Sequence, residues 1–145
     1  MDRFPPETLD LLRRTAELEI ETRMAAGRPV HRTVIWVVVD QADRVLIRSY
    51  QGRRARWYRE ALAEEAASIL VNHSRIDVRV EPAQDDERIQ ACSRALEAKY
   101  PGRSSTQAML RREILDTTLE LLPSQRGSLR IESADLGLKG GSRAG

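Results

Sequence analysis

Hydrophobic and polar residues change their spacing along the chain in a way that predicts helices mixed with strands. Residues 1–16 place two leucines and an alanine on one face behind a proline-rich start, which is typical of a short amphipathic helix. From Leu18 to Met24 apolar and charged residues alternate, which predicts a strand with one face in water. The next apolar run, Thr33 to Val39, does not alternate, so we expect a strand that is covered on both faces.

The middle of the chain contains signals for a hairpin, a helix and two more strands. Residues 40–43 predict a turn into a strand over Arg44 to Tyr50. Gly52 ends that strand, and the spacing from Arg54 to Glu65 is helical, with the two aromatic residues of this stretch on its apolar face and Glu60 on the opposite, polar face. Two further strands are expected between Ser68 and Val80, joined by a polar turn.

Residues that begin or end helices predict the elements between positions 85 and 122. An acidic pair at 85–86 predicts the start of a helix, which the Pro-Gly step at 101–102 ends. A serine pair at 104–105 is a candidate cap for a short helix through Leu110. Residues 115–122 favour a last strand, with a helix as the alternative.

These elements predict an α+β fold with about six strands and four short helices. A chain of 145 residues is long enough to hide most of its apolar surface in one core. We therefore expect one domain over residues 1–123, including the N-terminal helix. Residues 124–145 hold five of the eight glycines and predict a flexible C-terminal tail. The alternative for 129–131 is a short strand added to the sheet or to a partner.

Composition excludes several classes of protein. With 32% charged and 41% hydrophobic residues, the sequence is that of an ordinary globular protein, and no apolar run approaches the length of a membrane span. The start of the sequence lacks a signal-peptide pattern, so we expect a cytoplasmic protein. The single cysteine, Cys92, excludes an intramolecular disulfide, and we place it in the core together with Met24, Met109 and Trp36. Two histidines cannot supply a three-histidine zinc site, so no metal site is predicted.

The distribution of positive charge identifies one candidate site. The chain has 22 arginines and 2 lysines, and six of the arginines fall between positions 44 and 59, where no acid occurs. Such a patch either binds an anion or forms a solvated face. Arg53 and Arg54 stand at the expected start of a helix, the end that favours negative charge, and this conflict would be relieved by a bound anion. A formal net charge of only +2 argues against a nucleic-acid partner.

The residues around this junction resemble a known superfamily. Residues 31–34 (His-Arg-Thr-Val), Arg48-Ser49 and 52–54 (Gly-Arg-Arg) occupy places that match motifs of the split-barrel flavin-binding superfamily. That superfamily includes the pyridoxamine-phosphate oxidases and the deazaflavin-dependent nitroreductase-like proteins. The resemblance covers about Glu17 to Ile89 and is greatest to a small bacterial family of unknown function within it. The chain has Gly52 and Arg54 where the oxidases have serine and lysine.

The resemblance implies a six-stranded antiparallel split β-barrel with short flanking helices. It also implies a homodimer with FMN or a deazaflavin coenzyme at the subunit interface. It implies that the cofactor phosphate lies at the junction between Arg48 and Tyr58. The cofactor-binding residues implied in this way are Arg32, Thr33, Val34, Arg48, Ser49, Arg53, Arg54 and Tyr58. From the residues alone, Arg32 is also a candidate ion-pair partner of Glu19 or Glu21, and Arg48 a candidate for a cross-strand ion pair.

Two functions therefore stay open. The first is a flavin- or deazaflavin-binding oxidoreductase of unknown substrate, in which the cofactor carries the hydride and no side-chain acid or base is required, so no catalytic residue is named. The second is a non-catalytic split-barrel module that has lost flavin and binds another anion or a nucleotide through the same arginines.

Overall fold

The computed structural model describes residues 3–124 and 129–131, with the side chains of 129–131 left out of the description. Its helices are α1 (Pro6–Arg14), α2 (Arg56–Glu64), α3 (Asp86–Lys99) and α4 (Ser104–Met109), and its 3-10 helices are η1 (Gly52–Arg54) and η2 (Arg112–Thr117). Its strands are β1 (Leu18–Thr22), β2 (His31–Ile35), β3 (Val38–Val39), β4 (Val45–Ile47), β5 (Ala66–Val71), β6 (Ser74–Pro82), β7 (Leu119–Pro123) and β8 (Leu129–Ile131).

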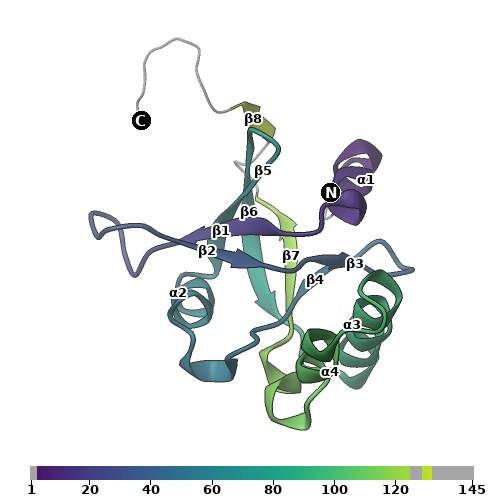
Figure 1. Cartoon of the computed structure of the whole chain (residues 1–145). Helices are drawn as coiled ribbons and strands as arrows, with labels where there is room; N and C mark the ends of the chain where they lie inside the picture. Colours follow the sequence, from purple (N-terminus) through teal and green to yellow (C-terminus); the bar gives the residue numbers. More distant parts are fainter. Residues whose placement is uncertain (1–2, 125–128, 132–145) are drawn as a thin grey trace.

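The strands form one antiparallel sheet in the order β2-β1-β5-β6-β7-β4-β3, with β8 beside β6. The two ends of this order, β2 and β3, are separated in the chain only by Trp36 and Val37, so the sheet curls back on itself (Figure 1). The α+β antiparallel prediction is confirmed, with eight short strands in the described residues in place of six. One reason is that the strand expected over 33–39 breaks at Trp36, where the indole stacks on Tyr100 at a centroid distance of 3.8 Å.

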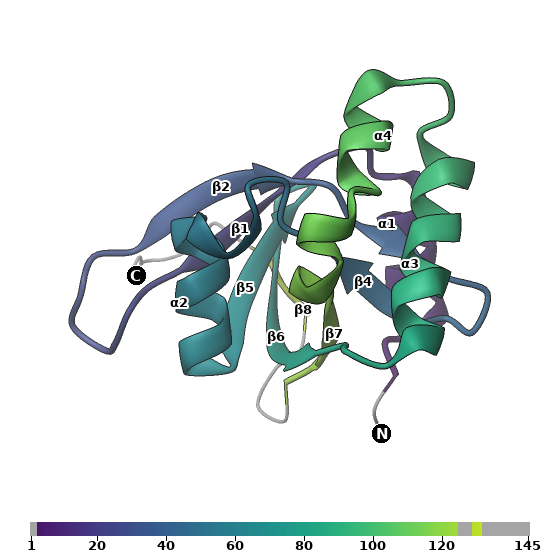
Figure 2. The same cartoon turned by 90° about the horizontal axis from the view of Figure 1, so that it is seen from below.

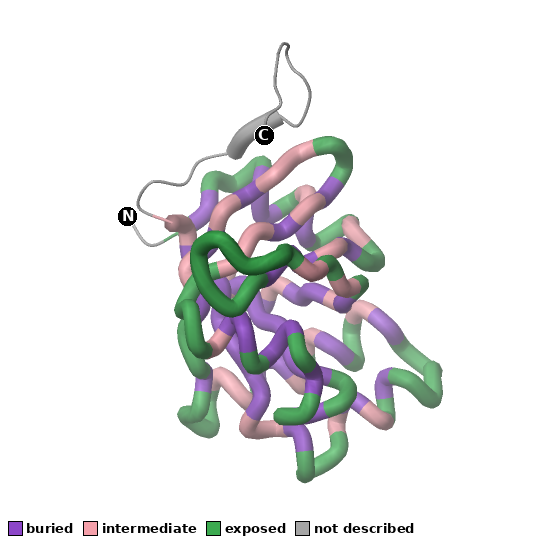
Figure 3. The backbone as a smooth tube through the Cα atoms, turned by 90° about the vertical axis from the view of Figure 1, so that its left-hand side faces the viewer, coloured by how far each residue is buried: buried purple, intermediate pink, exposed green. Residues whose placement is uncertain are grey.

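Two apolar clusters hold the layers together. The larger one lies inside the curled sheet and takes in side chains from α1 and α2, such as Leu12 and Trp57. The smaller one packs Val38 and Leu46, from the β3–β4 hairpin, against Cys92 and other residues of α3 and α4. Figure 2 shows α2 at the left of the view, beside β1 and β5, and the α3–α4 pair at the right, beside β4. Figure 3 shows buried segments inside with exposed turns around them.

Several boundaries differ from the predicted ones. Asp85 caps α3 as expected, because its side chain accepts a hydrogen bond from the Arg88 backbone N–H. The serine pair at 104–105 lies inside α4, whose cap position is Arg103, so that cap prediction is wrong. The last strand begins only at Leu119, because η2 occupies the residues before it. The alternative for 129–131 is confirmed by its backbone pairing with β6, and the rest of the expected tail lies outside the described residues.

Leu18 and Ile20 of β1 are buried as predicted, but other residues in and around β1 and β2 depart from the sequence interpretation. Val34, expected to be covered on both sides, is 56% exposed, and Met24 is exposed as well. Glu21, expected on a wet face, is only 7% exposed. Met109 and Cys92 are buried, as predicted, while Trp36 is only half-buried. The reason for the buried acid is that two guanidinium groups reach it, one from the adjacent strand β2 and one from β6, which lies beyond β5 in the sheet.

Those two groups are Arg32 on β2 and Arg75 on β6. Arg32 Nε donates to Glu21 Oε1 at 3.0 Å, which confirms the predicted pairing, and Arg75 binds the other carboxylate oxygen. Burial acts to raise the pKa of Glu21, but the hydrogen bonds and charges of Arg75 and Arg32 outweigh it and hold the pKa below its ordinary value of 4.5.

This ion triad predicts a pH-dependent stability. Because the folded-state pKa is depressed, the contribution of Glu21 is fully present above about pH 4.5 and is lost as the pH falls through the lower folded value. Glu21→Gln should lower the free energy of unfolding by about 1–2 kcal/mol at pH 7, and the difference from wild type should shrink below pH 4.5. Urea unfolding at several pH values measures this, and a difference that grew in acid would contradict it.

Candidate functional site

The predicted junction between strand and helix is present, but a 3-10 helix, η1, precedes the α-helix. After β4 the chain passes through Gly52, whose φ of +73° favours glycine, and enters η1. The helix expected to begin at Arg54 is therefore two elements, η1 and then α2. The N-cap of α2 is Ala55, which has no side-chain oxygen to accept the first N–H groups, and no acid occurs in the first turn. This end of α2 thus keeps donor groups that an anion can accept.

Arg48 is the largest fully buried side chain, at 2% exposure, and sits just after β4. Its Nε donates to Thr118 Oγ1 at 2.9 Å, and one terminal nitrogen donates to Ser93 Oγ at 3.1 Å and to the Met109 carbonyl at 3.0 Å. The other terminal nitrogen donates to the Ile89 carbonyl at 3.0 Å. The guanidinium therefore ties the end of β4 to α3, α4 and the start of β7.

All four acceptors of Arg48 are neutral. Within residues 3–124 and 129–131 no carboxylate pairs with it, so the expectation of a cross-strand ion pair is wrong. Burial lowers the pKa of Arg48 from its ordinary value, because the charged form loses its hydration. A buried cation that lacks a counter-charge is costly, and an anionic ligand would reduce that cost.

Ser49 and Tyr58, two more of the predicted site residues, belong to the scaffold in this structure. Ser49 is fully buried and donates its hydroxyl to the Gly52 carbonyl at 2.7 Å, which fixes the turn. Tyr58 is a buried residue of α2 and packs edge-on against Trp57. Burial raises the pKa of its hydroxyl. Neither lines a described pocket.

Arg53 and Arg54 are exposed on η1, where an anion could reach both of them. Arg53 is paired with Asp116 of η2, whose Oδ1 is buried without a hydrogen-bond partner in the described part of the chain. Arg54 makes no hydrogen bond or ion pair within the described residues. Asp116 therefore partly neutralises the charge of Arg53, whereas the charge of Arg54 is available to an anionic ligand.

A pocket of about 470 Å³ lies between β2, the junction and α4. It brings together three predicted site residues, Thr33, Val34 and Arg48. Arg32, which is held by Glu21, and the exposed Arg53 and Arg54 do not line it. The rest of its wall consists of residues outside the predicted cofactor-binding set, which are Glu17, Ile35, Trp36, Tyr50, Gln51, Ala55, Trp57, Arg103, Ser105 and Met109.

Arg103 is the cationic residue of this wall that sequence reasoning missed. Its guanidinium carbon lies 6.0 Å from the Trp36 ring centroid and 5.8 Å from that of Tyr100. The sequence signal that could have found it is the aromatic-Pro-Gly-Arg segment that ends α3, because a chain reversal there returns the arginine to the sheet.

Glu60 is a second residue that the sequence misplaced. It was expected on the solvated face of α2, yet it is 3% exposed. Its Oε1 accepts a hydrogen bond from Thr22 Oγ1 at 2.9 Å and lies 3.2 Å from His31 Nδ1. These contacts attach α2 to the first two strands.

The curled antiparallel sheet and the junction that follows β4 give this chain a split-barrel fold. The chain belongs to a family of uncharacterized proteins conserved in bacteria (DUF2255), whose family model matches residues 8–121. No curated protein matches the sequence.

Solved structures share the fold at low sequence identity. The heme storage protein HutZ from Vibrio cholerae has a TM-score of 0.64 and 16% identity, covering 89% of this chain and 94% of HutZ. A candidate pyridoxamine 5'-phosphate oxidase from Listeria innocua has a TM-score of 0.60 and 12% identity, covering 88% and 97%. A candidate 5-nitroimidazole antibiotic resistance protein from Bacteroides thetaiotaomicron has a TM-score of 0.58 and 10% identity, covering 86% and 82%. At these identities the likeness concerns the fold.

The described residues contain neither a membrane-spanning helix nor a cluster of metal ligands. Among them, no helix is long and apolar enough to cross a membrane. No group of three or more histidine, cysteine, aspartate or glutamate side chains in the described part could hold a metal ion.

Proposed function

We propose that this protein binds a flavin-type cofactor, FMN or a deazaflavin coenzyme, and acts as an oxidoreductase on a small substrate. The observation that carries the proposal is Arg48, a buried guanidinium without a carboxylate partner in the described residues, in the wall of a pocket that also presents aromatic rings. A planar ring system with an anionic group matches both features, since aromatic faces favour stacking and the cation favours negative charge.

The cofactor would supply the hydride chemistry when bound, and the chain would supply its orientation and a dry environment. Thr33 and Val34 would lie along the ring system, beside Trp36 and Trp57 of the same pocket. Arg53 and Arg54, with the uncapped N-terminus of α2, would hold the phosphate from the exposed side of the junction. Arg48 would act from the wall of the pocket by its charge, with Ser49, Tyr58 and Arg32 supporting that wall.

We also propose that two copies of the chain share this site. Val34 is a large apolar side chain on an outer strand, is more than half exposed, and lines the pocket from its open side. A second copy that covered Val34 would close the pocket and remove this apolar surface from water.

A second candidate function is a non-catalytic module that holds another planar anion. The favouring observation is the fold shared with a heme storage protein, together with the same buried Arg48 and aromatic wall, which suit a porphyrin carboxylate as well as a flavin. The two candidates differ in which ligand binds and in whether the bound ligand passes electrons to a substrate.

A visible absorption spectrum of the purified protein, followed by titration with FMN, the deazaflavin coenzyme and heme, tests the proposal. We expect saturable binding of FMN or the deazaflavin, seen as a change in cofactor fluorescence, in about one copy per chain. Heme binding alone would support the second function, and failure of all three ligands would overturn both.

Removing the two exposed junction arginines should release the cofactor without unfolding the protein. Arg53→Ala/Arg54→Ala is expected to weaken binding by about 30-fold or more, because two charge-assisted phosphate contacts are lost. Arg23→Ala/Arg28→Ala removes the same charge from the exposed β1–β2 loop and should bind like wild type. Fluorescence titration measures both, and equal affinity in the two double variants would remove the phosphate assignment.

A further inference from the structure

We propose a second ligand site, for a small organic anion with an apolar body, in the cavity between α3 and the β3–β4 hairpin. The cavity has a volume of about 620 Å³ and shares no lining residue with the pocket proposed for the cofactor. Its walls come from α1, the hairpin and one face of α3. The proposal stands on the shape and charge of this cavity and does not depend on the cofactor.

The floor of the cavity is apolar. Ala91, Ala95 and Ala98 form a row along α3, and Val38 and Val39 of β3 lie opposite them. Because the α3 side chains in this row are single methyl groups, the helix and the hairpin leave space between them. A short aliphatic or aromatic body would fill that space and bury apolar surface.

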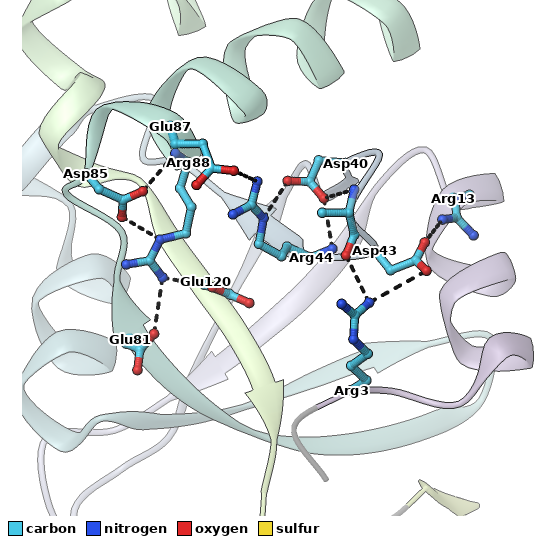
Figure 4. Close-up of polar contacts among 11 residues, drawn as sticks. Arg3, Arg13, Asp40, Asp43, Arg44, Glu81, Asp85, Glu87, Arg88 and Glu120 are labelled. Carbon is cyan, nitrogen blue, oxygen red and sulfur yellow. Dashed lines mark hydrogen bonds and ion pairs between the residues drawn. The ribbon is translucent and has the colours of Figure 1, made fainter.

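The acids around the cavity are already neutralised, as Figure 4 shows. Asp40 binds Arg44 Nε at 2.8 Å and also accepts the backbone N–H groups of Ala42 and Arg44, each at 2.9 Å. Glu87 pairs with the same arginine at 3.3 Å, and Asp43 pairs with Arg13 at 2.5 Å. Two of the four cations in the wall, Arg13 and Arg44, are therefore balanced by carboxylates.

The other two cations, Lys99 and Arg94, have no carboxylate partner in the described residues. Lys99 Nζ donates to the carbonyls of Leu12 at 3.0 Å and Val37 at 2.7 Å and lies 5.5 Å from the Tyr100 ring centroid, so one N–H of the ammonium group makes no hydrogen bond within the described residues. Burial lowers the pKa of Lys99 to about 8, as expected for a half-buried charge without an acid. Arg94 makes no hydrogen bond or ion pair within residues 3–124 and 129–131.

The positions of these cations define the ligand class. Helical periodicity places Arg94 and Lys99 on opposite flanks of the alanine row, so both can approach a single anionic group above it. A carboxylate or similar head between them would gain two charge-assisted hydrogen bonds, while its apolar body lies along the floor. A ligand that lacks the anionic head or the apolar body would therefore bind more weakly than one that has both.

Hexanoate is the probe for this site, with acetate and hexylammonium as matched controls that lack the body or the negative charge. In two-dimensional amide NMR of the full chain, hexanoate should shift the α3 resonances around Ala91, Ala95 and Ala98 saturably. Acetate should bind about tenfold or more weakly, and hexylammonium should not shift them. Equal shifts with hexylammonium, or no saturable shift with hexanoate, would overturn the proposal.

Two variants test the assignment of residues. Arg94→Glu should weaken hexanoate binding by about tenfold or more, because it replaces an attractive charge with a repulsive one. Arg28→Glu makes the same change on the exposed β1–β2 loop and should bind like wild type. Ala95→Leu, which fills the floor, should also weaken binding, while cofactor titration remains unchanged in all three. Wild-type hexanoate affinity in both Arg94→Glu and Ala95→Leu would overturn the site.

Discussion

Trp57→Ala is expected to lower the free energy of unfolding by about 3–5 kcal/mol, which is a large part of the stability of a domain of this size. The indole is only 6% exposed, belongs to the main core cluster, and packs edge-on against Tyr58 at a ring-centroid distance of 6.1 Å. Its removal leaves a cavity under the first turn of α2, at the point where the helix rests on the curled sheet. The same indole lines the candidate cofactor pocket, so ligand binding should fall as well.

Urea unfolding followed by circular dichroism measures this loss, and the fluorescence of the remaining Trp36 gives a second probe of the transition. Trp57→Phe keeps an aromatic ring in the same place and should recover more than half of the lost stability. A change of less than about 1 kcal/mol in Trp57→Ala would mean that α2 does not depend on this contact.

Much of the fold was predictable because local pattern and global structure agree there. The hairpin at 40–43, the cap at Asp85 and the apolar face of α2 all follow short-range rules, and the structure confirms them. The break of the predicted 33–39 strand was not predictable, because it depends on Tyr100, far along the chain, coming to stack on Trp36. The spacing of hydrophobic residues depends only on residues close in sequence, so it does not indicate a contact between Trp36 and Tyr100.

The candidate site was predictable to a smaller extent, for the same physical reason. The junction itself was found from its glycine and its arginines, which are adjacent in sequence. Whether a given polar side chain faces solvent or the interior depended on distant partners, as the buried Glu60 and its contact with His31 show. The second cavity had no sequence signal, because its cations and its alanine row are ordinary features of a solvated helix until the hairpin is placed against them.

Arg48→Met is expected to lower the free energy of unfolding by about 2–3 kcal/mol and to abolish the rise in melting temperature that a bound anion gives. Methionine matches the length of the arginine stem but donates no hydrogen bond, so the Met109 carbonyl and the Thr118 hydroxyl lose this donor. Each such loss costs about 1–3 kcal/mol, and the removal of a buried uncompensated charge offsets part of the sum.

Arg48→Lys separates the two roles of this side chain, because it keeps the positive charge and loses the planar fork that reaches four acceptors. It should be destabilised to an extent similar to Arg48→Met, since an ammonium group cannot reach β7, α3 and α4 together. If the charge recruits the anion, however, FMN should still raise the melting temperature of the lysine variant, since a ligand that binds only the folded state stabilises it. Thermal unfolding with and without FMN distinguishes these outcomes. A methionine variant that FMN stabilises as much as wild type would show that the buried charge plays no part in binding.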